Sequence, residues 1–337
     1  IYNSSLITCN LEIFHVSLFP LTPKDLYRLR QIANVFIKHG FGYLIESLNL
    51  QRYLSLGKRI ITFKKGAESL KKDKRSIAER ARMVLEELGP TFIKLGQILS
   101  ARSDLLPPDF LREFNKLQDA ISPFPFPAVK KIITEDFGST PAQLFSDFEE
   151  TPLAAASIAQ VHRASLSDGR EIIVKVQRPG IASQIKADLD ILFFLAPLAE
   201  RHIPRSHLYN PVGMVEEFAT TLRRELDFTV EAGHTDRFYR IFEEDDTIRI
   251  PQVYWDLTSK RVLTLERMKG IKVNDLESLD KAGLDRKKIA ARGVNIFLKQ
   301  VFEQGFFHAD PHPGNFLVLD NEVIGLVDFG IVGRLDE

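Results

Sequence analysis

The chain has little of what marks secreted, membrane-spanning or strongly charged proteins. Among its 337 residues is one cysteine, Cys9, which excludes an internal disulfide and a thiolate metal cage. Its longest apolar runs, such as residues 191–199, are too short and too interrupted by proline to span a bilayer. Lysine plus arginine equals aspartate plus glutamate at 45 each, so no overall field favours nucleic acid and we expect no nucleic-acid partner.

The first quarter of the sequence predicts helices and a basic connection. The first twenty residues have no basic front and no initiating Met, which favours an irregular start over a signal peptide. Apolar residues recur at helical spacing over 24–56, with breaks at Gly40 and Gly42. The stretch 58–75 holds eight Lys or Arg, which is typical of a solvated linker, with contact to an anionic membrane surface as the alternative.

The most informative motif is HADPHPGNF at 308–316, followed by DFG at 328–330. Asp310 lies five residues before Asn315 and eighteen before Asp328, the order in which kinase-like phosphotransferases place a catalytic carboxylate and two metal ligands. Mg²⁺ takes oxygen ligands, so Asn315 and Asp328 suit it, while Asp310 can accept a hydroxyl proton or orient water.

The same segment allows a second interpretation, a metal-hydrolase site made by His308, Asp310 and His312. Alternate residues of a strand share a face, which would bring these three side chains together. Pro311 and Pro313 oppose a regular strand there.

Residues 152–180 predict a strand, a tight loop, a strand, a turn at Asp168-Gly169 and a last strand. Period-two alternation in the last strand places Lys175 among apolar residues, where a lysine is costly unless it meets an anion such as a nucleotide phosphate. Alanines stand in the preceding loop where protein kinases have glycines. This candidate nucleotide loop comprises Leu153, Ala154, Ala155, Ala156, Ser157, Ile158, Ala159, Gln160 and Val161.

Helical spacing over 215–238 predicts a helix that holds Glu225, Asp227 and Glu231, one of which must pair with Lys175 in a kinase-like site. In a regular helix Asp227 and Glu231 share a face and Glu225 points elsewhere. Strands are expected at 251–255 and 261–266, then a hinge in which Glu266 and Met268 contact adenine through backbone groups, and a helix over 289–304.

The segment 89–110 predicts a helix that begins at Pro90 and is terminated by Pro107 and Pro108. Lys94 and Gln97, three residues apart, share one face of it. Gly96 inside this helix costs about 1 kcal/mol relative to alanine, so we expect a close packing partner against its backbone. Taken alone, the segment is typical of an amphipathic helix hairpin.

In order, KLGQ at 94–97, AAAS at 154–157, ELD at 225–227, HADPHPGN at 308–315 and DFG at 328–330 resemble the UbiB family of atypical kinase-like proteins. The resemblance spans residue 76 to the end, and its first two motifs are specific to that family. It implies an ATP-binding (or ADP-binding), Mg²⁺-dependent ATPase or kinase-like protein that supports ubiquinone biosynthesis. The partners that it implies are a membrane lipid or polyprenyl quinone precursor and ubiquinone-biosynthesis enzymes. It also implies a peripheral membrane protein on the cytoplasmic side of a bacterial inner membrane.

The resemblance also implies roles for single residues. Lys94 is matched to Glu225 over the nucleotide cleft, and Lys175 to Glu231. Asp310 is then the catalytic carboxylate, and Asn315 and Asp328 hold the metal. The K-x-G-Q helix should occupy the space where a protein kinase admits its peptide, which makes ATP hydrolysis the expected activity.

The expected fold is α+β and protein-kinase-like, with two lobes and an added helical K-x-G-Q extension. We expect an N-terminal helical and basic segment over 1–75, the extension over 76–150, the small lobe over 151–268 and the start of the large lobe over 269–337. Because the chain stops seven residues after Gly330, the large lobe is expected to be incomplete. A non-catalytic pseudokinase scaffold and a small-molecule phosphotransferase are the alternatives, and the K-x-G-Q segment argues against the latter.

Replacing Ala156 by Gly should change the preference between ATP and ADP. Removing the Cβ frees the loop backbone at a cost of about 1 kcal/mol in rigidity. Binding constants for both nucleotides, measured for the variant and the unmodified chain, check this. An unchanged ratio would mean that the loop does not select the nucleotide.

Overall fold

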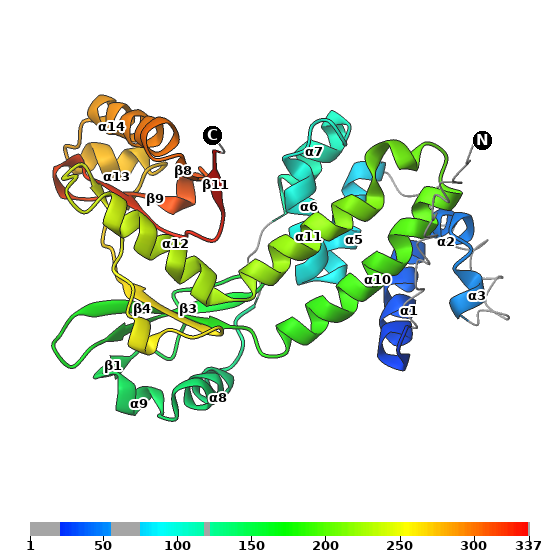
Figure 1. Cartoon of the computed structure of the whole chain (residues 1–337), viewed down its shortest axis with the longest axis horizontal. Coiled ribbons are helices and arrows are strands. Elements are labelled where there is room, and N and C mark those ends of the chain that lie inside the picture. Colours follow the sequence, from blue (N-terminus) through cyan, green and yellow to red (C-terminus); the bar gives the residue numbers. More distant parts are fainter. Residues whose placement is uncertain (1–20, 55–74, 118–121, 336–337) are drawn as a thin grey trace, which may run out of the picture. The chain divides into compact units, whose positions relative to one another are not determined.

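The computed structural model describes residues 21–54, 75–117 and 122–335, which belong to two compact units (Figure 1). The first unit comprises residues 1–71 and 187–215, and the second comprises residues 72–186 and 216–337. The expected irregular start, Cys9 and all of the basic stretch except Arg75 lie outside the described residues.

The first unit is helical, and the breaks expected near Gly40 and Gly42 are confirmed. Gly40 has a φ of +87°, a conformation that glycine adopts without strain, and it follows the end of the first helix. Arg28 of that helix forms an ion pair of 2.6 Å with the buried Asp188. The helices are α1 (Pro23–Lys38), α2 (Gly42–Ser47), α3 (Gln51–Leu54), the part of α10 (Ile181–His202) that follows residue 186, and the 3₁₀ turn η1 (Ser206–Tyr209).

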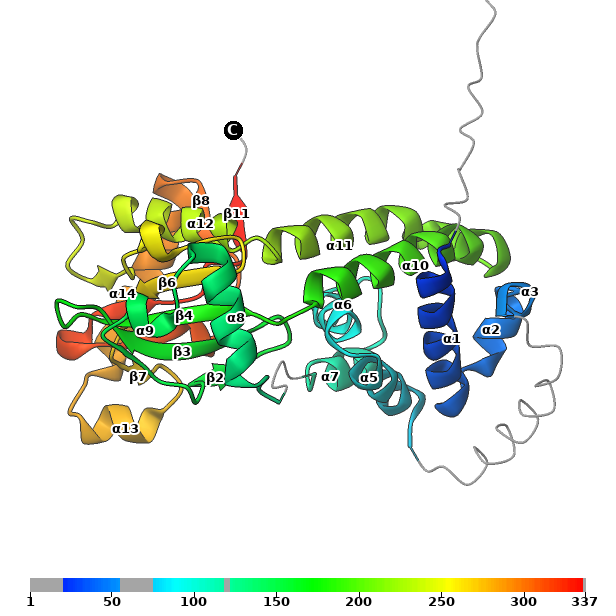
Figure 2. The same ribbon diagram turned by 90° about the horizontal axis from the view of Figure 1, so that it is seen from below.

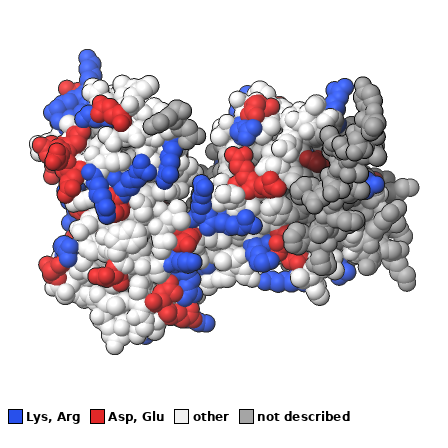
Figure 3. All heavy atoms as spheres, in the orientation of Figure 1, with Lys and Arg blue, Asp and Glu red and all other residues white. Residues whose placement is uncertain are grey.

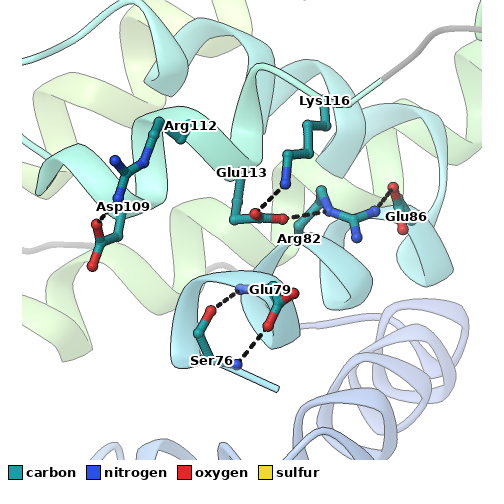
Figure 4. Close-up of polar contacts among 8 residues, drawn as sticks. All are labelled: Ser76, Glu79, Arg82, Glu86, Asp109, Arg112, Glu113 and Lys116. Carbon is teal, nitrogen blue, oxygen red and sulfur yellow. Dashed lines mark hydrogen bonds and ion pairs between the residues drawn. The ribbon is translucent and has the colours of Figure 1, made fainter. Parts of the chain in front are cut away.

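The second unit begins with the helices α5 (Ile77–Leu88), α6 (Pro90–Ser100) and α7 (Pro108–Phe114). Ser76 and Glu79 form a capping box at the start of α5, which satisfies backbone N–H groups that a helix start leaves unpaired (Figure 4). Arg82 of α5 forms hydrogen bonds with Glu86 of the same helix and with Glu113 of α7. Lys116 forms a further hydrogen bond with Glu113 (Figure 4). A charged network therefore fastens α7 to α5.

The K-x-G-Q helix α6 confirms one expectation and corrects another. A Cβ on Gly96 would overlap the side chains of Leu117 and Leu85, so the expected close packing is confirmed. The expected helix end was wrong, because α6 stops at Ser100 and the two prolines begin α7 instead, with Pro108 in its first turn. Proline suits the first turn of a helix as well as the position after a helix end. Here the two prolines start a helix.

A five-stranded antiparallel sheet follows, in the order β1-β3-β4-β6, with β2 also paired to β3. Ile172, Val174 and Val176 of β4 are fully buried on the face covered by α8 (Figure 2). The alternate residues of β4 face the other side, where Ile173 packs with residues of α12. The predicted hairpin and its alternation are thereby confirmed. The elements are α8 (Phe126–Phe137), α9 (Pro141–Leu144), β1 (Asp147–Phe148), β2 (Ala154–Ala155), β3 (Ala159–Ser165), β4 (Glu171–Gln177) and β6 (Val262–Glu266).

The expected single helix over 215–238 was wrong, because the chain breaks there into α11 (Pro211–Glu225) and α12 (Phe228–Ile241). Asp227 is the N-cap of α12, and its carboxylate accepts a hydrogen bond of 3.1 Å from the backbone N–H of Thr229. Aspartate competes with the helix for backbone N–H groups, which favours a new start at this position.

The end of the chain forms a third hydrophobic core beside α12. Phe238 of α12 and Phe242, which follows that helix, pack there with Phe306, Phe329 and the small strands. A four-stranded sheet has the order β5-β10-β9-β7, and β8 pairs with β11. The elements are β5 (Ile248–Arg249), β7 (Ile271–Lys272), α13 (Leu276–Lys281), α14 (Arg286–Leu298), a π-helical turn (Lys299–Glu303), β8 (Phe306–His308), β9 (Phe316–Val318), β10 (Ile324–Leu326) and β11 (Val332–Arg334), with 3₁₀ turns at Trp255–Leu257, Pro313–Asn315 and Asp320–Glu322.

The residues around β6 and α14 test two further expectations. The strand expected at 251–255 is not a regular strand, since only Val253 forms an isolated bridge, to Leu265. Pro251 and a 3₁₀ turn flank this bridge, so a regular strand ladder does not form. The helix expected over 289–304 is present as α14 and its π-helical continuation. In the described part of the chain, no helix combines the length and the apolar character needed to cross a membrane.

Two mid-helix glycines should respond in opposite ways to alanine. Gly293→Ala in α14 meets nothing within 4 Å and should raise the free energy of unfolding by about 0.5–1 kcal/mol. Gly96→Ala should lower it by about 1 kcal/mol, because overpacking of about 1–3 kcal/mol exceeds the gain in helix propensity. Urea unfolding of both variants measures the difference, and equal stabilisation by the two would contradict the close packing at Gly96.

Candidate functional site

Lys175 and Glu231 form an ion pair between the sheet and α12. The Nζ of Lys175 donates to both carboxylate oxygens of Glu231, at 3.1 and 2.8 Å. The side chain of Lys175 is 23% exposed and that of Glu231 9% exposed. The Nζ also lies 5.3 Å from the ring centroid of Phe228, which contributes a cation–π contact. Of the three acids weighed for this lysine, the structure brings Glu231 to it.

Neighbouring carboxylates keep this lysine charged. Burial would lower the pKa of Lys175, but the carboxylates of Glu231 and Asp328 outweigh it and hold that pKa above its usual range. In turn, the positive charge of Lys175 is the main cause that lowers the pKa of Asp328, and Lys94 lowers it further. Lys175 and Asp328 are therefore both charged at neutral pH.

Asp310 and Asn315 are joined directly. The Asn315 side-chain N–H₂ donates to the backbone carbonyl of Asp310 at 3.2 Å and to its Oδ2 at 2.9 Å. The backbone carbonyl of Asn315 accepts from Val327 N at 3.0 Å, beside Asp328. The β9–β10 hairpin, in which Phe316 pairs with Leu326, thus brings Asn315 next to the DFG segment.

His308 connects the loop that carries Asp310 to the DFG segment. Its Nδ1 accepts a hydrogen bond of 3.2 Å from the backbone N–H of Asp310, so its Nε2 carries the proton and donates to the carbonyl of Asp328 at 2.8 Å. The backbone N–H of His308 donates to the buried side-chain oxygen of Gln300 at 2.9 Å. The loop that presents Asp310 is therefore held from both sides.

The DFG segment packs against α12 and is hydrogen-bonded to it. Asp328 has a φ of +63°, a left-handed conformation uncommon for residues other than glycine and often found at functional sites. Its side chain stays exposed, while the following Phe329 is fully buried, with its ring centroid 5.0 Å from that of Phe238. The carbonyl of Phe329 is bonded to Nδ1 of His234 at 3.0 Å.

The K-x-G-Q helix contributes a second ion pair, with 2.7 Å between Lys94 Nζ and Glu225 Oε1. The charge of Glu225 also helps to raise the pKa of Lys175, so both ion pairs belong to one charge cluster. Gln97 instead donates to the backbone carbonyl of Leu117, at 3.4 Å. Asp227 serves as the cap of α12 and lies 3.7 Å from Lys260.

The alanine-rich loop, residues 153–161, lies at the edge of the sheet as β2, a short turn and the start of β3. The carbonyl of Ile158 accepts from Arg178 N at 2.7 Å, and the guanidinium of Arg178 donates to the carbonyl of Ala156 at 3.3 Å. Gln160 faces away from this turn, because its buried side chain exchanges two hydrogen bonds with the backbone of Phe124. Ser157 and Ala159 are buried as well, and Leu153 is exposed.

The expected adenine hinge follows β6. Glu266 ends that strand, and its carboxylate bonds Arg249 at 2.8 Å and the backbone N–H of Gln252 at 3.2 Å. The side chain of Met268 lies over Gly325 of β10, so the hinge packs on the strand that leads to Asp328.

Comparison with known proteins agrees with this geometry. A sequence profile described as the ABC1 atypical kinase-like domain matches residues 116–337, about two thirds of the chain. The chain belongs to the ABC1 atypical kinase-like family. The resemblance to UbiB proteins and the protein-kinase-like α+β fold are thereby confirmed.

Two curated relatives carry the name "Probable protein kinase UbiB". The one from Xanthomonas campestris pv. campestris (strain B100) is 41% identical over 326 residues, which cover 93% of this chain and 58% of the relative. The one from Marinobacter nauticus is 43% identical over 267 residues, 78% of this chain and 49% of the relative. The chain thus spans about half of the length of these relatives.

Among solved structures, the complex of Rv3197 with erythromycin from Mycobacterium tuberculosis is similar to this ABC1 chain. The two are 28% identical with a TM-score of 0.56, over 80% of this chain and 67% of the other.

The residues expected to hold a metal in this ABC1 chain have the donor atoms that Mg²⁺ takes. Asn315 uses its N–H₂ group toward Asp310, which leaves its amide oxygen as the acceptor. Asp328 is exposed and has a lowered pKa, so it offers an ionised carboxylate. Hard cations prefer such oxygen ligands, and the pair fits Mg²⁺, which when bound would offset charge on nucleotide phosphates.

The structure does not support a metal-hydrolase site made by His308, Asp310 and His312. Both ring nitrogens of His308 are engaged with the backbone, and His312 Nδ1 accepts from Gly314 N at 3.1 Å. Within residues 21–54, 75–117 and 122–335, no three His, Cys, Asp or Glu side chains gather as a metal site would require.

Several supporting residues were not found from the sequence. His234, Phe238, Gln300 and Arg178 orient the motif residues, yet none belongs to a motif. One signal was available for His234 and Phe238, since they lie three and seven residues after Glu231, on the same face of a helix. The contacts of Gln300 and Arg178 depend on tertiary packing and have no local signal.

The ion pair should show strong coupling in a double-mutant cycle. Lys175→Met leaves the Glu231 carboxylate without its partner and should lower the free energy of unfolding by about 2–3 kcal/mol, below the about 3–5 kcal/mol of a fully buried pair. In Lys175→Met with Glu231→Gln the loss should be smaller than the sum of the single losses. Urea unfolding of the four proteins gives the coupling, and strict additivity would argue against the pair.

Proposed function

We propose that this chain binds ATP or ADP with Mg²⁺ and hydrolyses ATP as an atypical kinase-like protein that supports ubiquinone biosynthesis at a membrane. The observation that carries the proposal is the charge cluster, in which Lys175 lies between Glu231 and Asp328 while Asp310 and Asn315 are hydrogen-bonded beside it. A structural ion pair alone would not require the additional carboxylates of Asp310 and Asp328 at the same place.

Each residue of the cluster has a proposed role. Lys175, oriented by Glu231, binds nucleotide phosphates, and Asn315 and Asp328 hold the metal. Asp310 orients the attacking water or accepts its proton, because its Oδ2 is fixed by Asn315. Residues 153–161 cover the phosphates, and backbone groups of Glu266 and Met268 contact adenine.

Hydrolysis, rather than transfer to a protein, is favoured by the position of the K-x-G-Q helix. Lys94 of α6 is paired at 2.7 Å with Glu225, the last residue of α11, just before α12 and its Glu231. We propose that α6 restricts access of a polypeptide substrate, with Gln97 supporting the helix and Asp227 the start of α12. In this proposal residues 76–150 form the extension, 151–268 the small lobe and 269–337 the start of the large lobe, after an N-terminal segment over 1–75.

The biological setting is proposed from the relatives. The two curated relatives are bacterial and carry the UbiB name, which supports a role beside ubiquinone-biosynthesis enzymes and a lipid or polyprenyl quinone precursor as partner. We place the chain at the cytoplasmic side of the bacterial inner membrane, as a peripheral protein.

Mg²⁺ with ATP or ADP should raise the unfolding temperature of the chain, and Asp328→Asn should abolish the rise. A ligand at one hundred times its dissociation constant adds about 2.7 kcal/mol when it binds only the folded state. Asp320→Asn is the matched control, because Asp320 is an exposed acid at the other end of the β9–β10 hairpin.

Thermal unfolding with and without each nucleotide measures the effect. A shift retained by Asp320→Asn and lost by Asp328→Asn supports the site, and release of labelled phosphate then tests hydrolysis. No shift with either nucleotide would exclude the proposed site and favour a non-catalytic scaffold. Robust transfer of labelled phosphate to an added protein would contradict the proposed hydrolysis.

A further inference from the structure

Basic side chains gather over α12 and β11 (Figure 3). Arg237 of α12 and Arg334 of β11 both approach the ring of Phe306, with their guanidinium carbons 4.0 and 5.6 Å from its centroid. Arg334 is also the strand partner of Phe306 in the β8–β11 pair. Two exposed cations are thus held around one buried ring.

His234 of α12 lies beside these two arginines. Burial lowers the pKa of His234, its hydrogen bond with the Phe329 carbonyl opposes this, and the positive charges of Arg334, Arg224 and Arg237 lower the pKa further. The ring centroids of His234 and Phe306 are 6.1 Å apart, which independently places this histidine beside the two stacked arginines.

Arg237 and Arg334 have no charge partner in the described part of the chain. Neither of them forms an ion pair or a side-chain hydrogen bond there. By contrast, Arg240, one turn farther along α12, forms an ion pair of 2.7 Å with Asp236. Like charges held together without a counter-ion repel one another, so the cluster favours an external anion.

The surface beside the cluster is hollowed. A cavity of about 280 Å³ opens over α12 and is lined by Gly233, Asp236, Arg237, Arg240 and Ile241. A Cβ at Gly233 would meet nothing within 4 Å, so the helix leaves open space there.

We propose that Arg237 and Arg334 form a binding site for a phosphomonoester anion on the outer face of α12. A phosphate carries close to two negative charges and three acceptor oxygens, and planar guanidinium groups match it with paired, charge-assisted hydrogen bonds. A carboxylate, with one charge and two oxygens, would leave part of this cluster unmatched. The site does not depend on the proposed nucleotide chemistry.

Anion binding here would act on the DFG segment through α12. His234, within the cluster, is bonded to the carbonyl of Phe329, and Glu231, one turn earlier, holds Lys175. An anion that removes the repulsion among the arginines stabilises α12 in the position that maintains both contacts.

The direct test is binding of inorganic phosphate to the whole chain at constant ionic strength, with chloride as the reference anion. Calorimetric titration without nucleotide should show phosphate binding that Arg237→Gln weakens by about tenfold or more, as expected for the loss of charge-assisted hydrogen bonds. Arg334→Gln should weaken it likewise. Arg240→Gln is the matched control, because Arg240 lines the same hollow but is already neutralised by Asp236.

Weakening by Arg237→Gln and Arg334→Gln with retention in Arg240→Gln would support the site. Phosphate binding no stronger than chloride, or equal effects of all three substitutions, would overturn it. Folding of each variant is checked by its unfolding temperature in chloride, and Arg334→Gln decides if Arg237→Gln fails to fold.

Phosphatidylcholine vesicles with and without phosphatidic acid then identify the source of the phosphomonoester. Binding to phosphatidic acid vesicles that requires Arg237 assigns a lipid headgroup, whereas binding of phosphate alone assigns a free anion. A failure of nucleotide binding would leave these results unchanged, so the two proposals are tested separately.

Discussion

The Lys175–Glu231 ion pair is the interaction on which the rest of the second unit depends. It joins two side chains 56 residues apart and fastens α12 to the sheet. Because α12 contributes Phe228 and Ala232 to the core under the sheet, and Phe238 to the core of the chain's end, one helix is common to both. The position of the DFG segment therefore follows from the position of this helix.

Electrostatics explains why the charged residues of the site gather in one place. In the proposed site, the four carboxylates of Glu231, Glu225, Asp310 and Asp328 outnumber the two lysines, Lys175 and Lys94. Asp328 is the exposed member, so the excess charge lies where a cation from solvent can reach it. A site built only for stability would be balanced by its own side chains, so the excess of carboxylates supports the proposed metal site.

Features that depend on a single local preference, such as strand alternation or helix propensity, could be predicted from the sequence. Features for which one residue type suits two structures equally well could not. The alternation around Lys175 and the close packing at Gly96 followed from strand period and helix propensity. The break at Asp227 was missed, because aspartate can lie on a helix face or cap a new helix, and only the packing of α12 decides. The prolines before α7 were ambiguous in the same way. The bonds from Gln160 to Phe124 join residues 36 apart and have no local signal.

The discontinuity of the first unit has a consequence during synthesis on the ribosome. Arg28 precedes its partner Asp188 by 160 residues, and most of the sheet lies between them in the chain. At about 5–20 residues per second, the N-terminal helices emerge roughly 8–30 s before the helix that supplies their buried counter-charge. Arg28 therefore lacks its buried partner until α10 has been translated, so α1 completes its packing only after most of the sheet has been made.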